Sequence, residues 1–591
     1  MKNEVLIQPY GGSLVDLLVG REEALQLTKE ATELSSLQLS PRSLCDLEML
    51  AVGGFSPLRR FMNRAEYLSV LQNMRLPDGT LWPIPITLPC SSATGLAGKR
   101  IGLRSPSNHL IAVMDVEEVY EREVELEPQL VCGTSSDDHS LVAEMRTWGK
   151  YYLSGPIKVL ELPQHYDYPE LRLTPEQVRE RLEAMGNPEV IAFHTRTAMH
   201  RAQEVLAKRA QQSVAGSLLV HPVVGVTRPG DIDHFTRVQL YKLLVDRYFD
   251  PNSTLLSLLP LALRMAGPRE AVWHAIVRRN FGANHLIMSR NYAAPENTST
   301  GQPFYAPHEA QEMVLRFSDE TGVRPAIFDD LVYLPDDDRY EQSTRIPKSK
   351  RTLSISSHQI RNDYLAKGKL LPPWFTRPET AAVLSKTFPP RCRQGVCIWF
   401  TGLPSSGKST VAEILAILLT EHGRRITMLD GDIVRTHLSH GLGFTREDRD
   451  INVRRIGFVA SEIARHNGTV ICAAVSPFNS TRNEVREMAG SENFVLVYVN
   501  TSPEVCERRD VKGFYAKARA GEIHGFTGVD DPYEPPQNPD IELETVHSTP
   551  EQNARKIIDW MRERGFIEPL FDEVEPDHIA LSIQPELGAG I

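Results

Sequence analysis

Apolar runs of strand length alternate with helix-like stretches over the last two-thirds of the chain. Residues 190–193 and 285–288 are short apolar segments of the kind that form buried strands, with apolar residues at helical spacing between them. The rhythm resumes later, with strand candidates at residues 396–400, 425–429, 469–475 and 494–499. Repeated alternation of strands and helices predicts two α/β regions, each with a parallel sheet.

The beginning of the chain follows another pattern. From residue 7 to about residue 168, short strand-like pieces alternate with Pro and Gly turns, as in the stretch WPIPITL at residues 82–88. Punctuation of this kind predicts a small β-rich or barrel-like domain. A helix is predicted to begin after Thr174, which suits an N-cap, with Pro175 at the first helical position.

These changes in pattern predict four regions in a chain of 591 residues, which is too long for one hydrophobic core. Residues 1–168 form the β-rich domain, 169–388 the first α/β domain and 389–567 the second. The stretch FPPR at 388–391 interrupts the pattern and is the predicted linker. Residues 568–591 are acidic and contain Pro, which favours a solvated extension.

Composition narrows the class of protein. Apolar residues make up 41% and charged residues 24% of the chain, as in an ordinary folded protein. A net charge of −11 argues against nucleic acid as a partner. Seven scattered cysteines without a C-x-x-C pair favour a reducing, cytoplasmic location. No signal-peptide pattern and no apolar run near ~18 residues is found, so no membrane partner is expected.

A glycine-rich octet follows the strand candidate at 396–400. Gly402, Gly407, Lys408 and Ser409 fit the Walker A pattern, and a helical pattern begins directly after it. Such a loop wraps backbone N–H groups around phosphates, while Lys408 reaches the β- and γ-phosphates and Ser409 holds Mg²⁺. The alternative is a glycine turn with a chance lysine. The predicted ATP-binding residues are Gly402, Leu403, Pro404, Ser405, Ser406, Gly407, Lys408, Ser409 and Thr410.

Two carboxylates follow the next strand candidate. Asp430 and Asp432 are separated by Gly431, and on a straight strand they would share a face. A phosphotransferase needs a metal-water ligand or a base at this place, because the attacking hydroxyl must be oriented as it loses its proton. The alternative is a capped turn between strand and helix.

Basic residues cluster in two later stretches. Residues 444–455 contain Phe444 and four arginines, a combination suited to binding an anion beside a stacked base. For Arg454 and Arg455, an exposed helix flank is an equal alternative. Residues 508–517 are basic and interrupted by Gly, which is typical of a lid that closes over phosphates.

Five ordered motifs between residues 394 and 534 resemble the adenylylsulfate (APS) kinase family: DGD at 430–432, DRDINVRRIG at 448–457, SPF at 476–478, KGFY at 512–515 and FTGVDDPYE at 526–534. The resemblance implies transfer of the ATP γ-phosphoryl group to the 3′-hydroxyl of APS, with Lys408 and Asp432 at the reaction centre. Ser476 stands where some descriptions of the family place a phosphoserine, and a structural serine is the alternative. The implied APS contacts are Asp430, Asp432, Arg435, Phe444, Arg449, Asn452, Lys512 and Phe526.

The front of the chain resembles the ATP sulfurylase family. The likeness is carried by GGFSPL at 53–58, WPIPI at 82–86, HPVVG at 221–225, MAGPRE at 265–270 and PPWF at 372–375. It implies a PUA-like barrel followed by a Rossmann-like nucleotidyltransferase domain. Most of these stretches are turns and strand ends, so they support the fold more than the chemistry.

The stretches that would carry sulfurylase chemistry depart from the family pattern. Thr195, Arg196 and His200 are kept, but His194 replaces a glutamine and Gln203 replaces the second histidine of an H-x-x-H pair. Farther on, Arg290 is kept while Tyr292 replaces a histidine. Losing one preorganised donor typically lowers a rate by ~10²–10³, so we expect a retained fold with little or no sulfurylase activity. Arg196 and His200 as surviving nucleotide contacts remain the alternative.

Three functions are therefore open. The chain is an APS kinase with a structural or regulatory front part, a bifunctional enzyme that makes 3′-phosphoadenylylsulfate (PAPS) from sulfate, or a regulatory subunit that binds nucleotide. Intact Lys408, Ser409 and Asp432 argue against the last. The family likeness further suggests a homo-oligomer such as a hexamer, with ATP as co-substrate, Mg²⁺ as cofactor and APS as acceptor.

Overall fold

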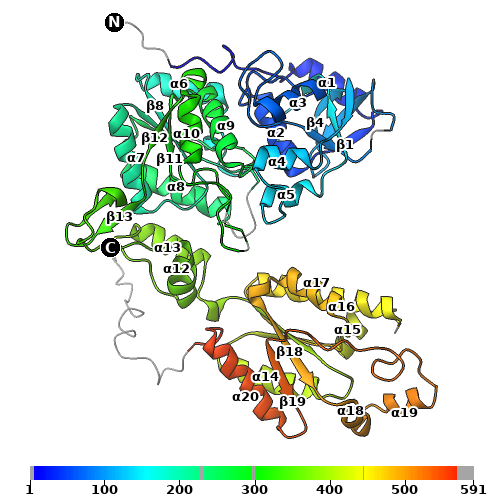
Figure 1. Cartoon of the computed structure of the whole chain (residues 1–591). Helices are drawn as coiled ribbons and strands as arrows, with labels where there is room; N and C mark the ends of the chain where they lie inside the picture. Colours follow the sequence, from blue (N-terminus) through cyan, green and yellow to red (C-terminus); the bar gives the residue numbers. More distant parts are fainter. Residues whose placement is uncertain are drawn as a thin grey trace, which may run out of the picture. The chain divides into compact units, whose positions relative to one another are not determined.

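The computed structural model describes residues 6–92, 94–226, 232–295, 297–298, 300–443 and 445–568, and for Asp432 the backbone alone. It divides into two compact units, Met1–Ile355 with Pro372–Val383 and Ser356–Leu371 with Leu384–Ile591 (Figure 1). From residue 569 onward, the predicted acidic tail lies outside the described residues.

The structure also bears on membrane-spanning segments and on the cysteines. Among the described helices, none is both long enough and apolar enough to cross a bilayer. All seven cysteines lie in described parts of the chain and are free thiols. The cytoplasmic location expected from them stays a prediction.

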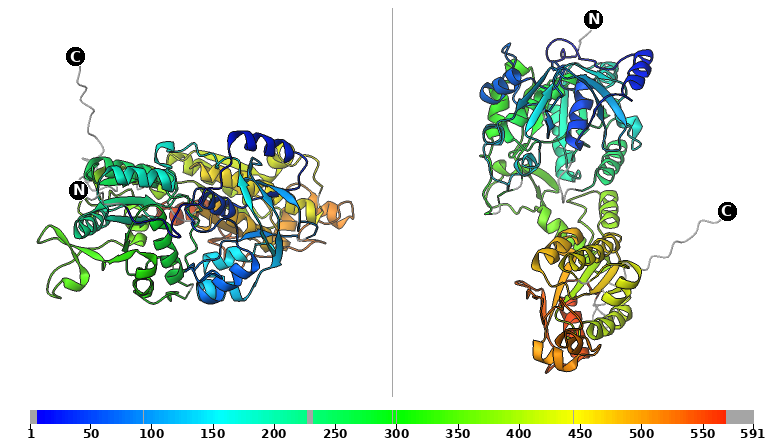
Figure 2. Two further views of the ribbon diagram at one scale, coloured as in Figure 1. Left: turned by 90° about the horizontal axis from the view of Figure 1, so that it is seen from above. Right: turned by 90° about the vertical axis from the view of Figure 1, so that its right-hand side faces the viewer.

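The N-terminal region of the first unit holds two small sheets, drawn from blue to cyan in Figure 2. One has the strand order β1-β3-β4-β7 and the other β2-β6-β5. The strands are β1 (Ser36–Gln38), β2 (Leu88–Cys90), β3 (Arg100–Arg104), β4 (Leu110–Asp115), β5 (Glu118–Glu121), β6 (Tyr151–Ser154) and β7 (Ile157–Val159). The prediction that this region is rich in β-structure is thus confirmed.

Helices also occur in this region, which the turn pattern did not predict. They are α1 (Arg21–Glu30), α2 (Pro41–Ala51), α3 (Arg64–Asn73), α4 (Leu126–Cys132) and α5 (Ser140–Met145). The expected strand at 82–88 was wrong, because β2 begins only at Leu88. Pro83 and Pro85 have no N–H group to give to a sheet, so the buried stretch before β2 stays outside the ladder.

A five-stranded parallel sheet of order β10-β9-β8-β11-β12 forms the second region of this unit. Thr174 caps α6 as expected, with Pro175 at its first position. The elements are α6 (Pro175–Ala184), β8 (Val190–Thr195), α7 (Arg201–Val214), β9 (Ser217–Pro222), α8 (His234–Tyr248), β10 (Thr254–Leu256), α9 (Gly267–Asn280), β11 (His285–Met288), α10 (Glu309–Arg316), α11 (Ser318–Thr321), β12 (Arg324–Ile327), β13 (Leu331–Leu334) and β14 (Arg339–Gln342). The next helix, α12 (Ser357–Gln359), belongs to the second unit, and α13 (Pro378–Thr387) begins in the first unit and ends in the second.

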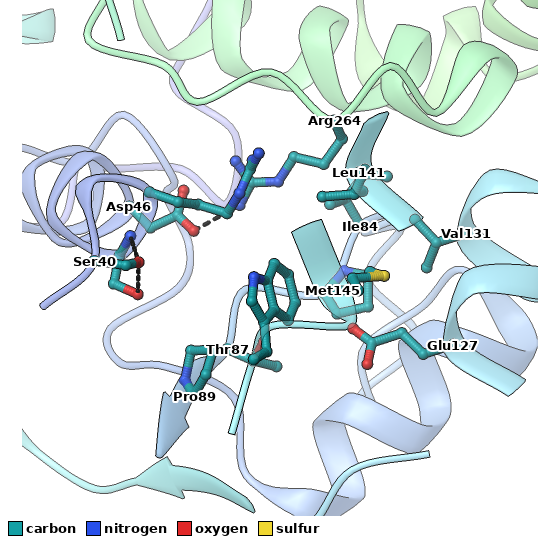
Figure 3. Close-up of a pocket in the computed structure, with 14 residues that line it drawn as sticks. Ser40, Asp46, Ile84, Thr87, Pro89, Glu127, Val131, Leu141, Met145 and Arg264 are labelled. Atoms are coloured by element: carbon teal, nitrogen blue, oxygen red, sulfur yellow. Dashed lines mark hydrogen bonds and ion pairs between the residues drawn. The ribbon is translucent and has the colours of Figure 1, made fainter. Parts of the chain in front are cut away.

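Buried ion pairs join the two regions of the first unit. Arg264, just before α9, reaches Asp46 of α2 at 2.6 Å, and Arg42 of α2 donates to the Leu263 carbonyl oxygen at 2.9 Å (Figure 3). A cavity of about 20 Å³ lies beside them, room for about one water molecule. The front of the chain therefore packs as one body.

The second unit is built on a parallel sheet of order β16-β17-β15-β18-β19. Helices α14 and α20 cover one face and α16 and α17 the other (Figure 1). The elements are β15 (Val396–Thr401), α14 (Lys408–Glu421), β16 (Ile426–Asp430), α15 (Gly431–His437), α16 (Arg446–Arg465), β17 (Thr469–Ala473), α17 (Asn479–Ala489), β18 (Phe494–Asn500), α18 (Pro503–Arg509), α19 (Phe514–Arg519), β19 (Ile541–Glu544) and α20 (Pro550–Glu563).

The predicted strands of this unit are confirmed to within two residues at each end. Alternate residues of β15 point to opposite faces, so that Ile398 belongs to the core under α14 and Trp399 to the core under α16. Burial on both faces explains the unbroken apolar run of β15. The sheet thereby holds the start of the phosphate-binding loop rigidly at its carboxyl edge.

Candidate functional site

The glycine-rich octet joins β15 to α14 and takes the shape of a phosphate-binding loop. Gly402 has φ of +149°, and a Cβ atom there would lie 2.7 Å from the Val499 carbonyl oxygen. Gly407 has φ of +103° and forms the N-cap of α14. Both positions therefore need glycine, because an L side chain would be strained in either conformation and would collide at Gly402.

Lys408 lies over the centre of this loop. Its Nζ donates to the carbonyl oxygens of Gly402 at 3.0 Å and of Leu403 at 2.7 Å. Burial lowers the pKa of Lys408 to about 8, and the positive charge of Lys512 adds to the shift. The amine is thus held where the loop converges and remains mostly protonated at neutral pH.

The Ser409 hydroxyl donates to Asp430 Oδ2 at 2.7 Å. Asp430 ends β16 and Ser409 lies in the first turn of α14, so the fold brings together two groups from separate strand ends. Hydroxyl and carboxylate oxygens are ligands that Mg²⁺ prefers beside nucleotide phosphates. The donor set fits that ion, and the APS contact expected of Asp430 from the sequence stays a prediction.

Two further predicted site residues, Arg449 and Asn452, lie on α16. Arg449 donates to Thr527 Oγ1 and pairs with Asp531, while Asn452, one turn later, is 7% exposed. Among the described residues, the Asn452 side-chain oxygen has no hydrogen-bond partner. A buried amide oxygen of this kind is costly, and a hydroxyl or amine of a substrate would satisfy it.

Of three further predicted contacts, only the Arg435 side chain lies among the described residues. Arg435 donates to the Gly443 carbonyl oxygen at 3.0 Å and so holds the loop that leads into α16. The side chain of Asp432, whose backbone lies in α15, and all of Phe444 lie outside the described residues. Their roles stay predictions.

The basic stretch after β18 forms short helices next to the loop. The Tyr515 hydroxyl donates to the Pro404 carbonyl oxygen at 3.1 Å, and the Tyr515 ring packs edge-on against Phe526 at 5.0 Å. Lys512 is exposed between α18 and α19. This arrangement is that of a flap tied to the phosphate-binding loop.

Ser476 is 2% exposed, and its Oγ accepts a hydrogen bond from the Trp399 indole at 3.0 Å. The backbone there has φ of +39°, so the residue turns the chain sharply after β17. Burial and this bond favour a structural role for Ser476. They leave little access for a phosphoryl donor.

Arg454 and Arg455 point away from the loop. Arg454 forms a two-bond ion pair with Glu484 of α17, with a shortest distance of 2.6 Å. Arg455 donates to the Leu438 carbonyl oxygen at 3.3 Å. Both contacts are those of a structural helix flank.

In the first unit, His194 is turned into the core. Its Nδ1 accepts from Arg278 Nη2 at 2.5 Å, and its ring packs on His274 at 4.5 Å and on Tyr292 at 5.5 Å. Burial, with the charge of Arg278 adding to it, lowers the pKa of His194 well below its ordinary value. The His194 ring is therefore neutral, and its Nδ1 already accepts a hydrogen bond from Arg278.

His200 is the N-cap of α7. Its Nδ1 lies 3.1 Å from the Thr376 hydroxyl, its ring stacks on Phe375 at 4.4 Å, and burial lowers its pKa to about 4. The side-chain oxygen of Gln203 accepts from the His200 backbone N–H at 2.6 Å. The residue that replaces the second histidine thus closes the first turn of the helix.

Thr195 and Tyr292 also contact other side chains inside the domain. The Thr195 hydroxyl lies 2.6 Å from the Tyr241 hydroxyl, and the Tyr292 hydroxyl lies 3.2 Å from His274 Nδ1. Arg290 is exposed, and Arg196 is partly buried beyond the end of β8. The structure brings these predicted residues to one end of the sheet, but several face the core.

The sequence motifs missed Thr501 and Thr545, which touch the phosphate-binding loop, while Arg509, which also touches it, belongs to the basic stretch 508–517 that was predicted as a lid. Thr501, Arg509 and Thr545 all bond to the Ser406 carbonyl oxygen. A polar residue directly after a buried apolar strand was the available signal for Thr501, and Thr545 follows β19 in the same way.

Comparison with known families finds three matches along the chain. Models described as PUA-like domain, ATP-sulfurylase and Adenylylsulphate kinase match residues 7–162, 169–387 and 394–544. Proteins named sulfate adenylyltransferase from Chaetomium globosum and Coccidioides immitis are 44% and 43% identical over 570 residues, covering 95% of this chain and 99% of each relative.

A solved structure of similar architecture is described as a hexameric APS kinase from Thiobacillus denitrificans. It is 33% identical, has a TM-score of 0.78, and the match covers 95% of this chain and all of that one. The relatives in sequence and in structure are thus named for different activities, although each match covers 95% of this chain and at least 99% of the relative. This chain belongs to the family in which a PUA-like domain, an ATP-sulfurylase domain and an adenylylsulfate kinase domain follow one another in a single polypeptide.

Proposed function

We propose that the working activity of this chain is that of an APS kinase, which moves the γ-phosphoryl group of ATP to the 3′-hydroxyl of APS and yields PAPS and ADP. The observation that carries the proposal is the grouping of Lys408, Ser409 and Asp430 on a complete phosphate-binding loop. Phosphoryl transfer depends mostly on positioning and on charge stabilisation, and this grouping supplies both.

Each group has a separate task in this reaction. The loop N–H groups and the start of α14 bind the phosphates, and protonated Lys408 stabilises charge on the oxygens of the transferred group. Ser409 and Asp430 would hold Mg²⁺, which would neutralise negative charge on the nucleotide phosphates when bound. Asp432 is assigned as the carboxylate that orients the 3′-hydroxyl, and Arg449 and Asn452 as contacts of APS.

We further propose that the sulfurylase domain has lost its activity and serves as a scaffold or regulatory part. Support comes from His194, whose Nδ1 is taken by Arg278, and from Gln203, whose side chain caps α7. A neutral His194 and an amide at position 203 cannot supply the positive charge that would stabilise charge developing on a phosphate. Arg196 and His200 as residual nucleotide contacts remain compatible with the fold.

The second candidate is a bifunctional enzyme that makes PAPS from sulfate in two steps. It is favoured by the name sulfate adenylyltransferase, which relatives carry at 44% and 43% identity over the full chain. The two candidates make the same prediction for the kinase domain and differ only in the front part.

We also propose that the chain forms a homo-oligomer. The support is the similar Thiobacillus denitrificans protein, which is described as hexameric. Its small-molecule partners would be ATP and APS.

Two assays on the full chain test the function. APS-dependent release of ADP, lost in Lys408→Ala while the circular dichroism spectrum is kept, is the result expected for the kinase. Sulfate-dependent exchange of pyrophosphate into ATP is expected to stay at background. Exchange well above background would favour the bifunctional enzyme, and absence of ADP release would reject the kinase.

A further inference from the structure

One carbonyl group of the phosphate-binding loop carries an unusual number of donors. The Ser406 carbonyl oxygen lies 3.1 Å from Thr501 Oγ1, 3.1 Å from Thr545 Oγ1 and 3.4 Å from Arg509 Nη1. Other contacts tie these groups to one another: the two threonine hydroxyls are 2.6 Å apart, and Arg509 Nη1 donates to Thr545 Oγ1 at 2.9 Å. We call Thr501, Thr545 and Arg509 the carbonyl clamp.

The sheet register brings the two threonines together. In the parallel pair of β18 and β19, Asn500 lies opposite Glu544, and the next residues along the two strands are Thr501 and Thr545. Their side chains meet at the carboxyl edge of the sheet, where β15 passes into the loop. The strands are held by a two-sided core, so the hydroxyls sit on a rigid support.

The two threonine hydroxyls have one proton each for three contacts, so one of these contacts is not a hydrogen bond at any moment. Thr545 Oγ1 accepts from Arg509, since a guanidinium can only donate, and it keeps one proton for the Ser406 carbonyl oxygen. Thr501 has one proton, which it gives either to that carbonyl or to Thr545. Thr501 is 4% exposed, so water competes little for this hydroxyl.

Fixing this carbonyl also fixes a donor to phosphate. The peptide group between Ser406 and Gly407 is planar and trans, so its C=O and N–H point in opposite directions. The clamp holds the oxygen against the ends of β18 and β19, and the Gly407 N–H is thereby aimed to the other side of the peptide. Gly407, with φ of +103°, would otherwise have wide conformational freedom.

We propose that Thr501 and Thr545 are positioning residues for ATP, which aim the Gly407 N–H at a nucleotide phosphate by holding the Ser406 carbonyl. The proposal rests on the kinase function proposed above, in which this loop binds ATP. Arg509 links the same carbonyl to the flap, because it ends α18 and also donates to the Thr545 carbonyl oxygen at 2.7 Å. Arg509 thus ties the flap to the loop at a second point, besides the bond from Tyr515 to Pro404.

The test compares Thr501→Val and Thr545→Val with the serine variants at both positions. Valine keeps the shape but removes the hydroxyl, and serine restores it. Loss of one neutral hydrogen bond corresponds to about 2- to 10-fold in binding, so each valine variant should weaken binding of ATP by about that factor. Titration calorimetry with ATP and Mg²⁺ measures the Kd, and kinase assays measure KM for ATP and for APS.

The clamp predicts a selective effect. Kd and KM for ATP should rise in both valine variants and return in the serine variants, while KM for APS stays within about two-fold. Thr420→Val, on the exposed side of α14, is the matched control and should change neither. Unchanged ATP binding in both valine variants overturns the proposal, as does an equal loss for ATP and APS, which indicates general loosening. If wild-type protein binds ATP but makes no PAPS, the kinase function fails while the calorimetric test of the clamp still stands.

Discussion

At the residue scale, Lys408 is the side chain on which phosphoryl transfer depends most directly. Its Nζ is positioned by two loop carbonyls, so Lys408→Ala removes the charge without removing a structural core contact. We expect a loss of kcat/KM on the order of 10²–10³-fold, measured as APS-dependent ADP release. A variant with more than a tenth of wild-type activity would contradict this role.

The pH dependence follows from the same residue. A phosphate needs the protonated amine, and burial lowers the pKa of Lys408 to about 8, so kcat/KM for ATP should fall as pH rises through about 8. This parameter reports groups of the free enzyme. Because Lys512 contributes to the lowered pKa of Lys408, Lys512→Gln should move the fall in kcat/KM to higher pH. A profile that stays level to pH 9.5 would contradict the assignment.

Ser476 allows a direct choice between a covalent and a structural role. Ser476→Ala leaves the buried Trp399 N–H without its acceptor, which costs about 1–3 kcal/mol. We expect a lower melting temperature of the kinase unit but kcat within a few-fold of wild type. Loss of activity without loss of stability, or phosphoserine at this position by mass spectrometry during turnover, would support the covalent role instead.

At the element scale, the variant Gln203→His in the first turn of α7 tests whether one missing histidine separates this chain from an active sulfurylase. Gln203→His should cost about 0.5–1.5 kcal/mol, because the side-chain acceptor for the His200 N–H is lost. Pyrophosphate exchange should stay at background, since Arg278 still donates to His194 Nδ1 and Tyr292 still packs on His194 and His274. Exchange that appears in this variant alone would show that the rest of the pocket is competent.

Elements of the second unit were the most predictable part of the structure. Unbroken apolar runs such as β15 are long enough to separate a strand from a turn, and the Walker A pattern fixes the start of α14. The stretch before β2 misled the prediction, because alternating Pro and apolar residues look like a strand yet cannot pair as one. The helices α1 to α5 were missed because turn residues mask their starts.

Local pattern predicted which residues gather at the phosphate-binding loop, but it did not predict how they pair. The bond from Ser409 to Asp430 and the meeting of Thr501 with Thr545 depend on strand order and register. Such pairings join residues 21 and 44 positions apart, and no spacing rule along the chain encodes them. For the same reason the inward turn of His194 could be found only from the packing of α9.

At the scale of the whole molecule, the two units differ in how they use the residues that were predicted to form their sites. The front unit keeps its sheet, its core and its buried ion pairs, yet its predicted site residues are largely used for packing. The rear unit keeps a loop, a lysine and a hydroxyl–carboxylate pair in working positions. A family match to a domain establishes its fold and leaves its activity to be measured.

The most direct measurement gives the purified full-length protein two substrate mixtures and follows both reactions on one preparation. With ATP, Mg²⁺ and APS, we predict PAPS and ADP in equal amounts. With ATP, Mg²⁺, sulfate and labelled pyrophosphate, we predict no exchange above that of a sample without sulfate. Absence of PAPS in the first mixture, or clear sulfate-dependent exchange in the second, would contradict the division of labour between the two units.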